Sequence, residues 1–64
     1  MYYILAFNNG QRVNFDATDN ECAENYSTSL FQIGLNRFGF GLTAKLYVGA
    51  EHPEHVICEF TFKS

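Results

Sequence analysis

Four short apolar runs surround one segment of helical periodicity, and this arrangement restricts the chain to few folds. The runs span residues 2–7, 11–17, 42–48 and 56–62, and the helical segment lies between the second and the third. The expected element order is therefore ββαββ, in which one helix covers one face of a four-stranded sheet. A chain of 64 residues should form a single domain, residues 1–64, and its 47% hydrophobic content supplies a core.

The segment Asn8-Asn9-Gly10 separates the first two runs and predicts a hairpin turn. Two registers are compatible with it. A two-residue turn places the even-numbered residues of the first run beside Val13 and Phe15, whereas a three-residue loop with left-handed Gly10 places the odd-numbered residues there. We favour the three-residue loop because it buries the bulkier set, which is Tyr3, Leu5 and Phe7.

The helical segment opens with Thr18-Asp19-Asn20-Glu21, which fits a capping box with Thr18 as the N-cap. Apolar residues then recur at helical spacing and are expected to face the sheet. This stripe consists of Cys22, Ala23, Tyr26, Leu30 and Ile33. Either Gly34 or Gly39 is expected to end the helix as a left-handed cap.

The order of the strands follows from which runs are apolar on both faces. The first and fourth runs meet this description and are predicted to be central, whereas the second and third alternate with polar residues. The prediction is an α+β fold with one helix packed on a four-stranded mixed sheet, in the order 2-1-4-3 with strands one and four parallel. This element order resembles the β-grasp fold, and such a widespread fold implies no particular function.

Charge excludes one class of partner. The chain has seven acidic and four basic residues, for a net charge of −3. Direct nucleic-acid binding needs a stripe of basic residues, and the four basic residues here are scattered, so we expect no direct binding of nucleic acid. No apolar run approaches the roughly 18 residues of a membrane span. The first residues lack the basic region and cleavage site of a signal peptide. We therefore expect a cytoplasmic protein that contacts neither nucleic acid nor a membrane.

The two cysteines are expected to be free thiols, as in a reducing compartment. Cys22 is placed on the apolar face of the helix, where it packs as a small hydrophobic residue. A disulfide between Cys22 and Cys58 is an alternative, because the sequence does not determine the distance between these two residues.

Two segments contain residue types that are common in functional sites. Glu51-His52-Pro53-Glu54-His55 has the side chains of zinc sites and acid–base catalysis, but Pro53 prevents helical pairing of the histidines, and we interpret it as an exposed loop. Residues 37–42 weakly resemble the aromatic strand of RNA-recognition domains, but we interpret them as a helix cap and turn. We expect no enzymatic activity, no cofactor and no metal.

Two surfaces are candidates for binding a partner. The first is a group of acids near the start of the helix, Asp16, Asp19, Glu21 and Glu24. Carboxylates about 5–6 Å apart on a helix approach the spacing of phosphates. The second is the sheet face that the helix leaves uncovered, where Tyr2, Ile4, Tyr47 and Ile57 are expected to form an apolar patch.

In size and charge, though in no motif, the chain is similar to small phage-encoded inhibitors of host machinery such as anti-CRISPR proteins. That resemblance implies a non-enzymatic inhibitor in the host cytoplasm. The acids and the exposed aromatics would block a nucleic-acid-binding surface of a basic partner complex. The alternative is a housekeeping interaction subunit that forms a homodimer through the uncovered sheet face.

Overall fold

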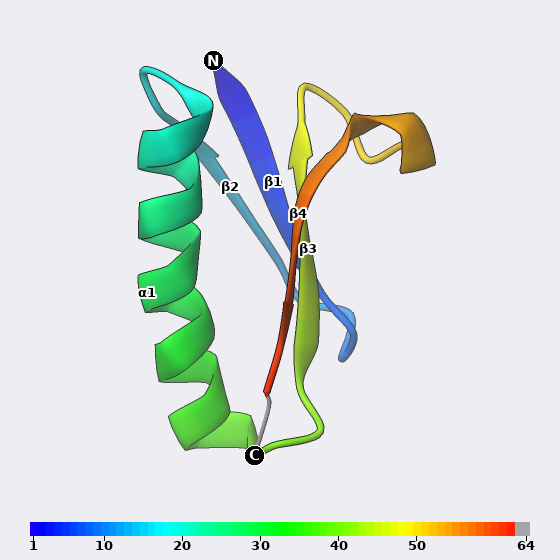
Figure 1. The fold of residues 1–64 in the computed structure, drawn as a ribbon. Helices are drawn as coiled ribbons and strands as arrows, with labels where there is room; N and C mark the ends of the chain where they lie inside the picture. The colour runs from blue at the N-terminus through cyan, green and yellow to red at the C-terminus, as the bar shows by residue number, and fades with distance from the viewer. Residues whose placement is uncertain (63–64) are drawn as a thin grey trace.

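A computed structural model describes residues 1–62 of the chain. Its elements, in chain order, are β1 (Tyr2–Phe7), β2 (Arg12–Asp16), α1 (Asn20–Phe38), β3 (Thr43–Val48), the short 3₁₀ helix η1 (Pro53–His55) and β4 (Val56–Thr61). Figure 1 shows α1 packed along one face of a single sheet, with the β3–β4 connection on the other side. The predicted α+β class and the ββαββ order are confirmed.

The predicted strand order and the parallel pair are wrong. The sheet has the order β2-β1-β3-β4, and all neighbouring strands are antiparallel. Only four residues connect α1 to β3, so the chain reverses at the end of the helix and β3 pairs with β1. β4 is an edge strand, and it is not apolar on both sides, because the face turned away from α1 carries Glu59 and Thr61.

The favoured hairpin register is confirmed. Tyr3 lies opposite Phe15 and Leu5 lies opposite Val13, so the bulkier residues of β1 face the helix. Gly10 has a φ of 96°, a conformation that residues with a Cβ rarely adopt and that the three-residue loop requires.

Asp19, rather than Thr18, is the N-cap of α1. Its backbone is extended, and its carboxylate accepts a hydrogen bond from the Cys22 amide at 2.8 Å. This backbone hydrogen bond is the main reason why the pKa of Asp19 lies below its usual value. The helix ends at Phe38, and the Gly39 amide donates to the Leu35 carbonyl, so Gly39 is the predicted glycine that caps it.

The predicted buried stripe of α1 is also wrong in part. The residues that face the sheet are Ala23, Ser27, Phe31 and Gly34, with Leu30 at the margin, whereas Cys22 is exposed and Tyr26 and Ile33 are 50% and 63% exposed. Three of the buried residues are small, and they let the helix approach the sheet closely. A Cβ on Gly34 would lie 2.7 Å from Cδ2 of Leu42. Hydrophobicity alone does not identify such positions.

Replacing Ser27 by alanine should stabilise the protein. Ser27 is fully buried, and its hydroxyl has no hydrogen-bond partner within residues 1–62. Removing an unsatisfied buried hydroxyl should raise the free energy of unfolding by about 1 kcal/mol. Ser29→Ala, an exposed change on the same helix, is the control and should give a smaller gain in urea unfolding. Equal gains would contradict the burial of the Ser27 hydroxyl.

Candidate partner-binding surfaces

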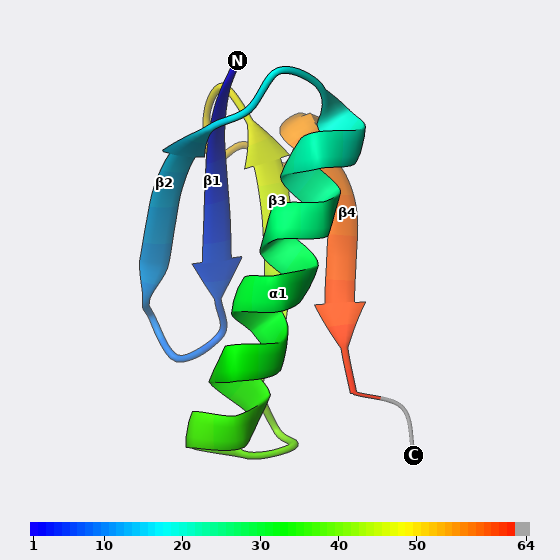
Figure 2. The same cartoon turned by 90° about the vertical axis from the view of Figure 1, so that its left-hand side faces the viewer.

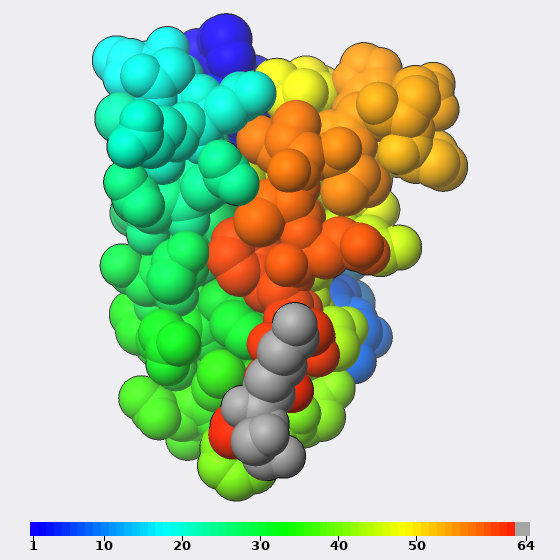
Figure 3. All heavy atoms as spheres, viewed as in Figure 1, coloured from blue at the N-terminus to red at the C-terminus, as the bar shows by residue number. Residues whose placement is uncertain are grey.

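One end of the molecule gathers most of the acidic side chains. β2 and β3 finish there, and β1 and β4 begin there, so the start of α1 and the β3–β4 connection lie at the same end of the molecule, on opposite sides of the sheet (Figure 1). Five acids at this end form no ion pair within residues 1–62, and we call this group the acidic end. They are Asp16, Asp19, Glu21, Glu24 and Glu54. Figure 3 shows the start of α1 in cyan and the connection in yellow and orange at the same end.

The four acids predicted from the sequence lie at the same end of the fold but do not form one flat patch. Asp16 points to the sheet face away from α1, because Phe15 beside it points toward the helix. Asp19 is engaged in the helix cap, and Glu24 is half-buried on the helix. The acids therefore wrap around the end of the fold. Sequence reasoning missed Glu54, because its position depends on where the β3–β4 connection returns.

Tyr3 fixes the start of the helix over the sheet at this end. Its hydroxyl donates a hydrogen bond to Oδ1 of Asn20 at 2.7 Å, and its ring stacks on Phe15 with centroids 5.6 Å apart. Burial is the main cause that raises the pKa of Tyr3, so the hydroxyl stays protonated and can donate. The first turn of α1 and its acids are thus held by the core.

The basic residues are placed elsewhere or are already paired. Arg12 binds Glu51 through two hydrogen bonds, from Nε to Oε1 at 2.6 Å and from Nη2 to Oε2 at 3.0 Å. This bidentate contact raises the pKa of Arg12 and lowers the pKa of Glu51. Lys45 lies 3.9 Å from Glu59, and Arg37 is in the last turn of α1, at the other end. Lys63 lies outside the described residues.

The sheet face away from α1 is less open than predicted. Tyr2 is 45% exposed, but Ile4 and Tyr47, which lie opposite each other on β1 and β3, are half-buried. The Arg12–Glu51 contact ties β2 to the β3–β4 connection across this face, and a cavity of about 350 Å³ lies beside it. Ile57 was expected on this face, but it packs against the core at an irregularity in the β3–β4 pairing.

The two histidines lie in the β3–β4 connection, where the His55 ring contacts the backbone of β3 and His52 is exposed. Nδ1 of His55 lies 2.8 Å from the Val48 carbonyl, and the rings of His52 and His55 have centroids 5.7 Å apart. Within residues 1–62, no three His, Cys, Asp or Glu side chains form a group that could hold a metal ion.

The aromatic segment at residues 37–42 does not form a strand. Phe38 belongs to the last turn of α1, and Phe40, 75% exposed, lies in the turn before β3. The likeness to an RNA-binding strand is therefore wrong, and the interpretation as a helix cap and turn is confirmed. Phe40 stacks on Phe62 with centroids 4.2 Å apart.

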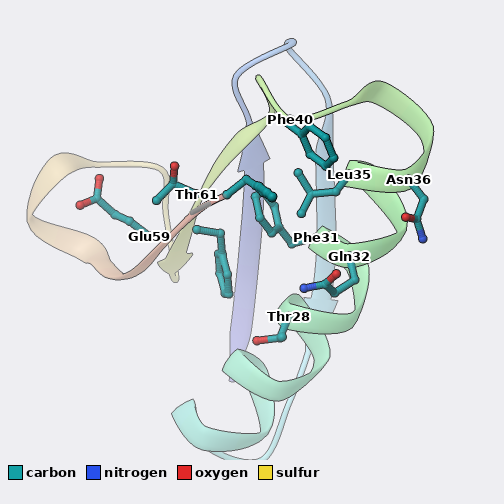
Figure 4. Close-up of a pocket in the computed structure, with 10 residues that line it drawn as sticks. Thr28, Phe31, Gln32, Leu35, Asn36, Phe40, Glu59 and Thr61 are labelled. Atoms are coloured by element: carbon teal, nitrogen blue, oxygen red, sulfur yellow. The ribbon is translucent and has the colours of Figure 1, made fainter. Parts of the chain in front are cut away.

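A groove of about 490 Å³ runs between α1 and β4 (Figure 4). Its apolar part is supplied by Phe31, Leu35, Phe40, Phe60 and Phe62. Amide and hydroxyl side chains line its polar part, from Thr28, Gln32, Asn36 and Thr61. Glu59 is the one ionisable side chain among its lining residues. The groove is thus an apolar surface with a polar margin.

The two thiols should react at different rates. Both cysteines are free; Cys22 is exposed and Cys58 is half-buried. Burial, and then the Glu24 carboxylate, raise the pKa of the Cys58 thiol, which lowers the fraction of reactive thiolate. Alkylation at pH 8, followed by mass spectrometry, should label Cys22 at least about tenfold faster. The control is Cys22→Ser, in which Cys58 is the remaining thiol and should react slowly. Faster labelling of Cys58 than of Cys22 in the unmodified chain would contradict the structure.

Comparison with known proteins found no matching family model, no similar curated protein and no similar solved structure. Within residues 1–62, no helix is long and apolar enough to cross a membrane.

Proposed function

We propose that this chain is a non-enzymatic binding protein whose acidic end docks on a basic, nucleic-acid-binding surface of a partner protein and blocks it. The observation that carries this proposal is the gathering of five acids at one end, while Arg12 and Lys45 each pair with an acid outside this group, Glu51 and Glu59. The five carboxylates outnumber the Met1 ammonium group, which lies at the same end, so this end attracts a positively charged surface from a distance and speeds association.

Exposed apolar area at the same end supports the proposal. Tyr2 lies directly opposite Asp16 on the outer sheet face and is 45% exposed, and Met1 beside it is 58% exposed. Tyrosine is enriched at protein interfaces because its ring is apolar while its hydroxyl stays hydrated. Charges would guide the approach, and Tyr2 would supply an anchor that loses water on binding.

The proposed mechanism is competition. Carboxylates held on a rigid fold occupy the positions that phosphates of a nucleic acid would take on the partner, so the two cannot bind together. In this respect the chain would act as a phage-encoded inhibitor of host machinery does, for example an anti-CRISPR protein, in the host cytoplasm. The alternative is a housekeeping subunit that dimerises through the outer sheet face, and the half-buried Ile4 and Tyr47 leave little apolar surface for it.

A competition experiment tests this proposal. The chain is immobilised and incubated with a cell lysate at low salt, and the retained proteins are then challenged with duplex DNA, with RNA, or with salt. The expected result is a basic nucleic-acid-binding protein that is released by nucleic acid and by salt, since both compete for its basic surface. Retained proteins that none of the three releases would contradict the proposal.

A further inference from the structure

Along the free edge of β2, the backbone N–H and C=O groups of three alternate residues point away from the sheet. Hydrogen bonds from the Phe7 amide to the Gln11 carbonyl and from the Ala17 amide to the Met1 carbonyl fix which residues of β2 bond to β1. Because hydrogen-bonded and non-bonded positions alternate in an antiparallel pair, the odd-numbered residues of β2 turn their backbone toward β1. The backbone groups of Arg12, Asn14 and Asp16 therefore point away from the sheet.

The side chains along this edge are complementary to themselves. If a second β2 pairs antiparallel about Asn14, each Arg12 lies opposite Asp16 of the second copy, and Asn14 lies opposite its equivalent. The backbone groups that meet in this register are those that β1 leaves unpaired. Opposite charges on directly facing residues stabilise such a pair. Shifting the register by two residues in either direction loses both charge pairs.

Arg12 can serve both contacts. Its Nε and Nη2 bind Glu51, and its Nη1 donates to the Gln11 carbonyl at 3.2 Å. A guanidinium has five N–H groups, so the Arg12 guanidinium, while bound to Glu51, still has N–H groups that can donate to another carboxylate. Asp16 forms no ion pair within residues 1–62 and is free to accept.

The helix side of the same edge is apolar and partly uncovered. Val13 and Phe15 are half-buried, and Tyr26 packs edge-on against Phe15 with centroids 4.8 Å apart while remaining 50% exposed. Farther along, Ile33 and Val13 line an open groove of about 150 Å³ between α1 and β2. Figure 2 shows that α1 crosses the sheet obliquely from the β4 side and leaves much of β2 beside it rather than beneath it.

We propose that two copies of this chain associate through β2 about a two-fold axis at Asn14, forming one eight-stranded antiparallel sheet with both helices on the same face. The pairing places Val13 of each copy opposite Phe15 of the other on the helix side. It also covers the unpaired strand edge, which otherwise promotes uncontrolled association. β4 offers no equivalent, because Glu59 is its one charged residue. This proposal does not depend on the proposed function.

The test measures self-association of the full chain by sedimentation equilibrium up to about 1 mM. Asp16→Arg and Arg12→Asp each place like charges opposite one another in the homodimer, so each should dimerise at least about tenfold more weakly. An equimolar mixture of these two variants restores both opposite-charge pairs and should form a heterodimer. Circular dichroism verifies that each variant is folded.

Asn14→Pro provides a second variant, because it removes the outward amide at the centre of the pair while an edge strand tolerates proline. It should abolish the dimer. A wild-type chain that stays monomeric over the whole concentration range would overturn the proposal. A dimer that survives Asn14→Pro, or variants whose mixing restores nothing, would overturn it as well.

Discussion

Phe31→Ala is expected to unfold much of the protein, whereas Ile33→Ala, two positions along the same helix, leaves it folded. Phe31 is 4% exposed and packs on Phe60 with ring centroids 5.5 Å apart, while Ile33 is 63% exposed. Replacing a buried phenylalanine by alanine costs about 3–5 kcal/mol. That is comparable to the whole stability of a domain of this size, about 3–10 kcal/mol.

Urea unfolding followed by circular dichroism measures both variants at micromolar concentration. Ile33→Ala is the matched control, because both changes remove a large apolar side chain from one helix. A greater loss in the free energy of unfolding for Ile33→Ala than for Phe31→Ala would contradict the orientation of α1 in the structure. It would favour the buried stripe that was predicted from the sequence.

Neutralising three of the five acids of the acidic end should slow association with a basic partner by about tenfold to a hundredfold, because most of the charges that steer the encounter are removed. The variant is Glu21→Gln, Glu24→Gln and Glu54→Gln together. It leaves the cap residue Asp19 and the edge residue Asp16 unchanged, so the fold and the proposed dimer are not disturbed.

A second variant with the same net charge separates position from total charge. Gln11→Lys, Gln32→Lys and Asn36→Lys place three positive charges away from the acidic end. Each set changes the formal net charge from −3 to zero. Stopped-flow association rates at low and high salt should fall for the first set and change by only a few fold for the second. Equal losses for both would show that net charge, rather than the acidic end, drives binding.

Most local features of the fold were predictable from the sequence, because short-range chemistry determines them, although the N-cap of α1 is Asp19 and not the predicted Thr18. The hairpin register followed from the size of Tyr3, Leu5 and Phe7. The end of α1 was restricted to Gly34 or Gly39, and Gly39 is the one that caps it. The buried face of α1 was not predictable from hydrophobicity. Ser27 and Gly34 are buried because the helix approaches the sheet closely, and this approach is a property of the packed structure.

The strand order and the composition of the acidic end depended on long-range arrangement. The apolar residues of β4 suggested a central strand, but Glu59 and Thr61 occupy its outer face, and β3 pairs with β1 instead. Glu54 is thirty residues from Glu24 in the chain and reaches the same end because β3 and β4 form a hairpin. Sequence reasoning therefore identified four of the five acids and missed the fifth.

Hydrogen exchange of this chain, free and bound to the partner captured by the competition experiment, tests the central claim most directly. If the acidic end is the contact surface, binding should protect amides in residues 16–24 and 51–55. Protection confined to the outer face of β1 and β3, around Ile4 and Tyr47, with residues 16–24 and 51–55 unchanged, would contradict it.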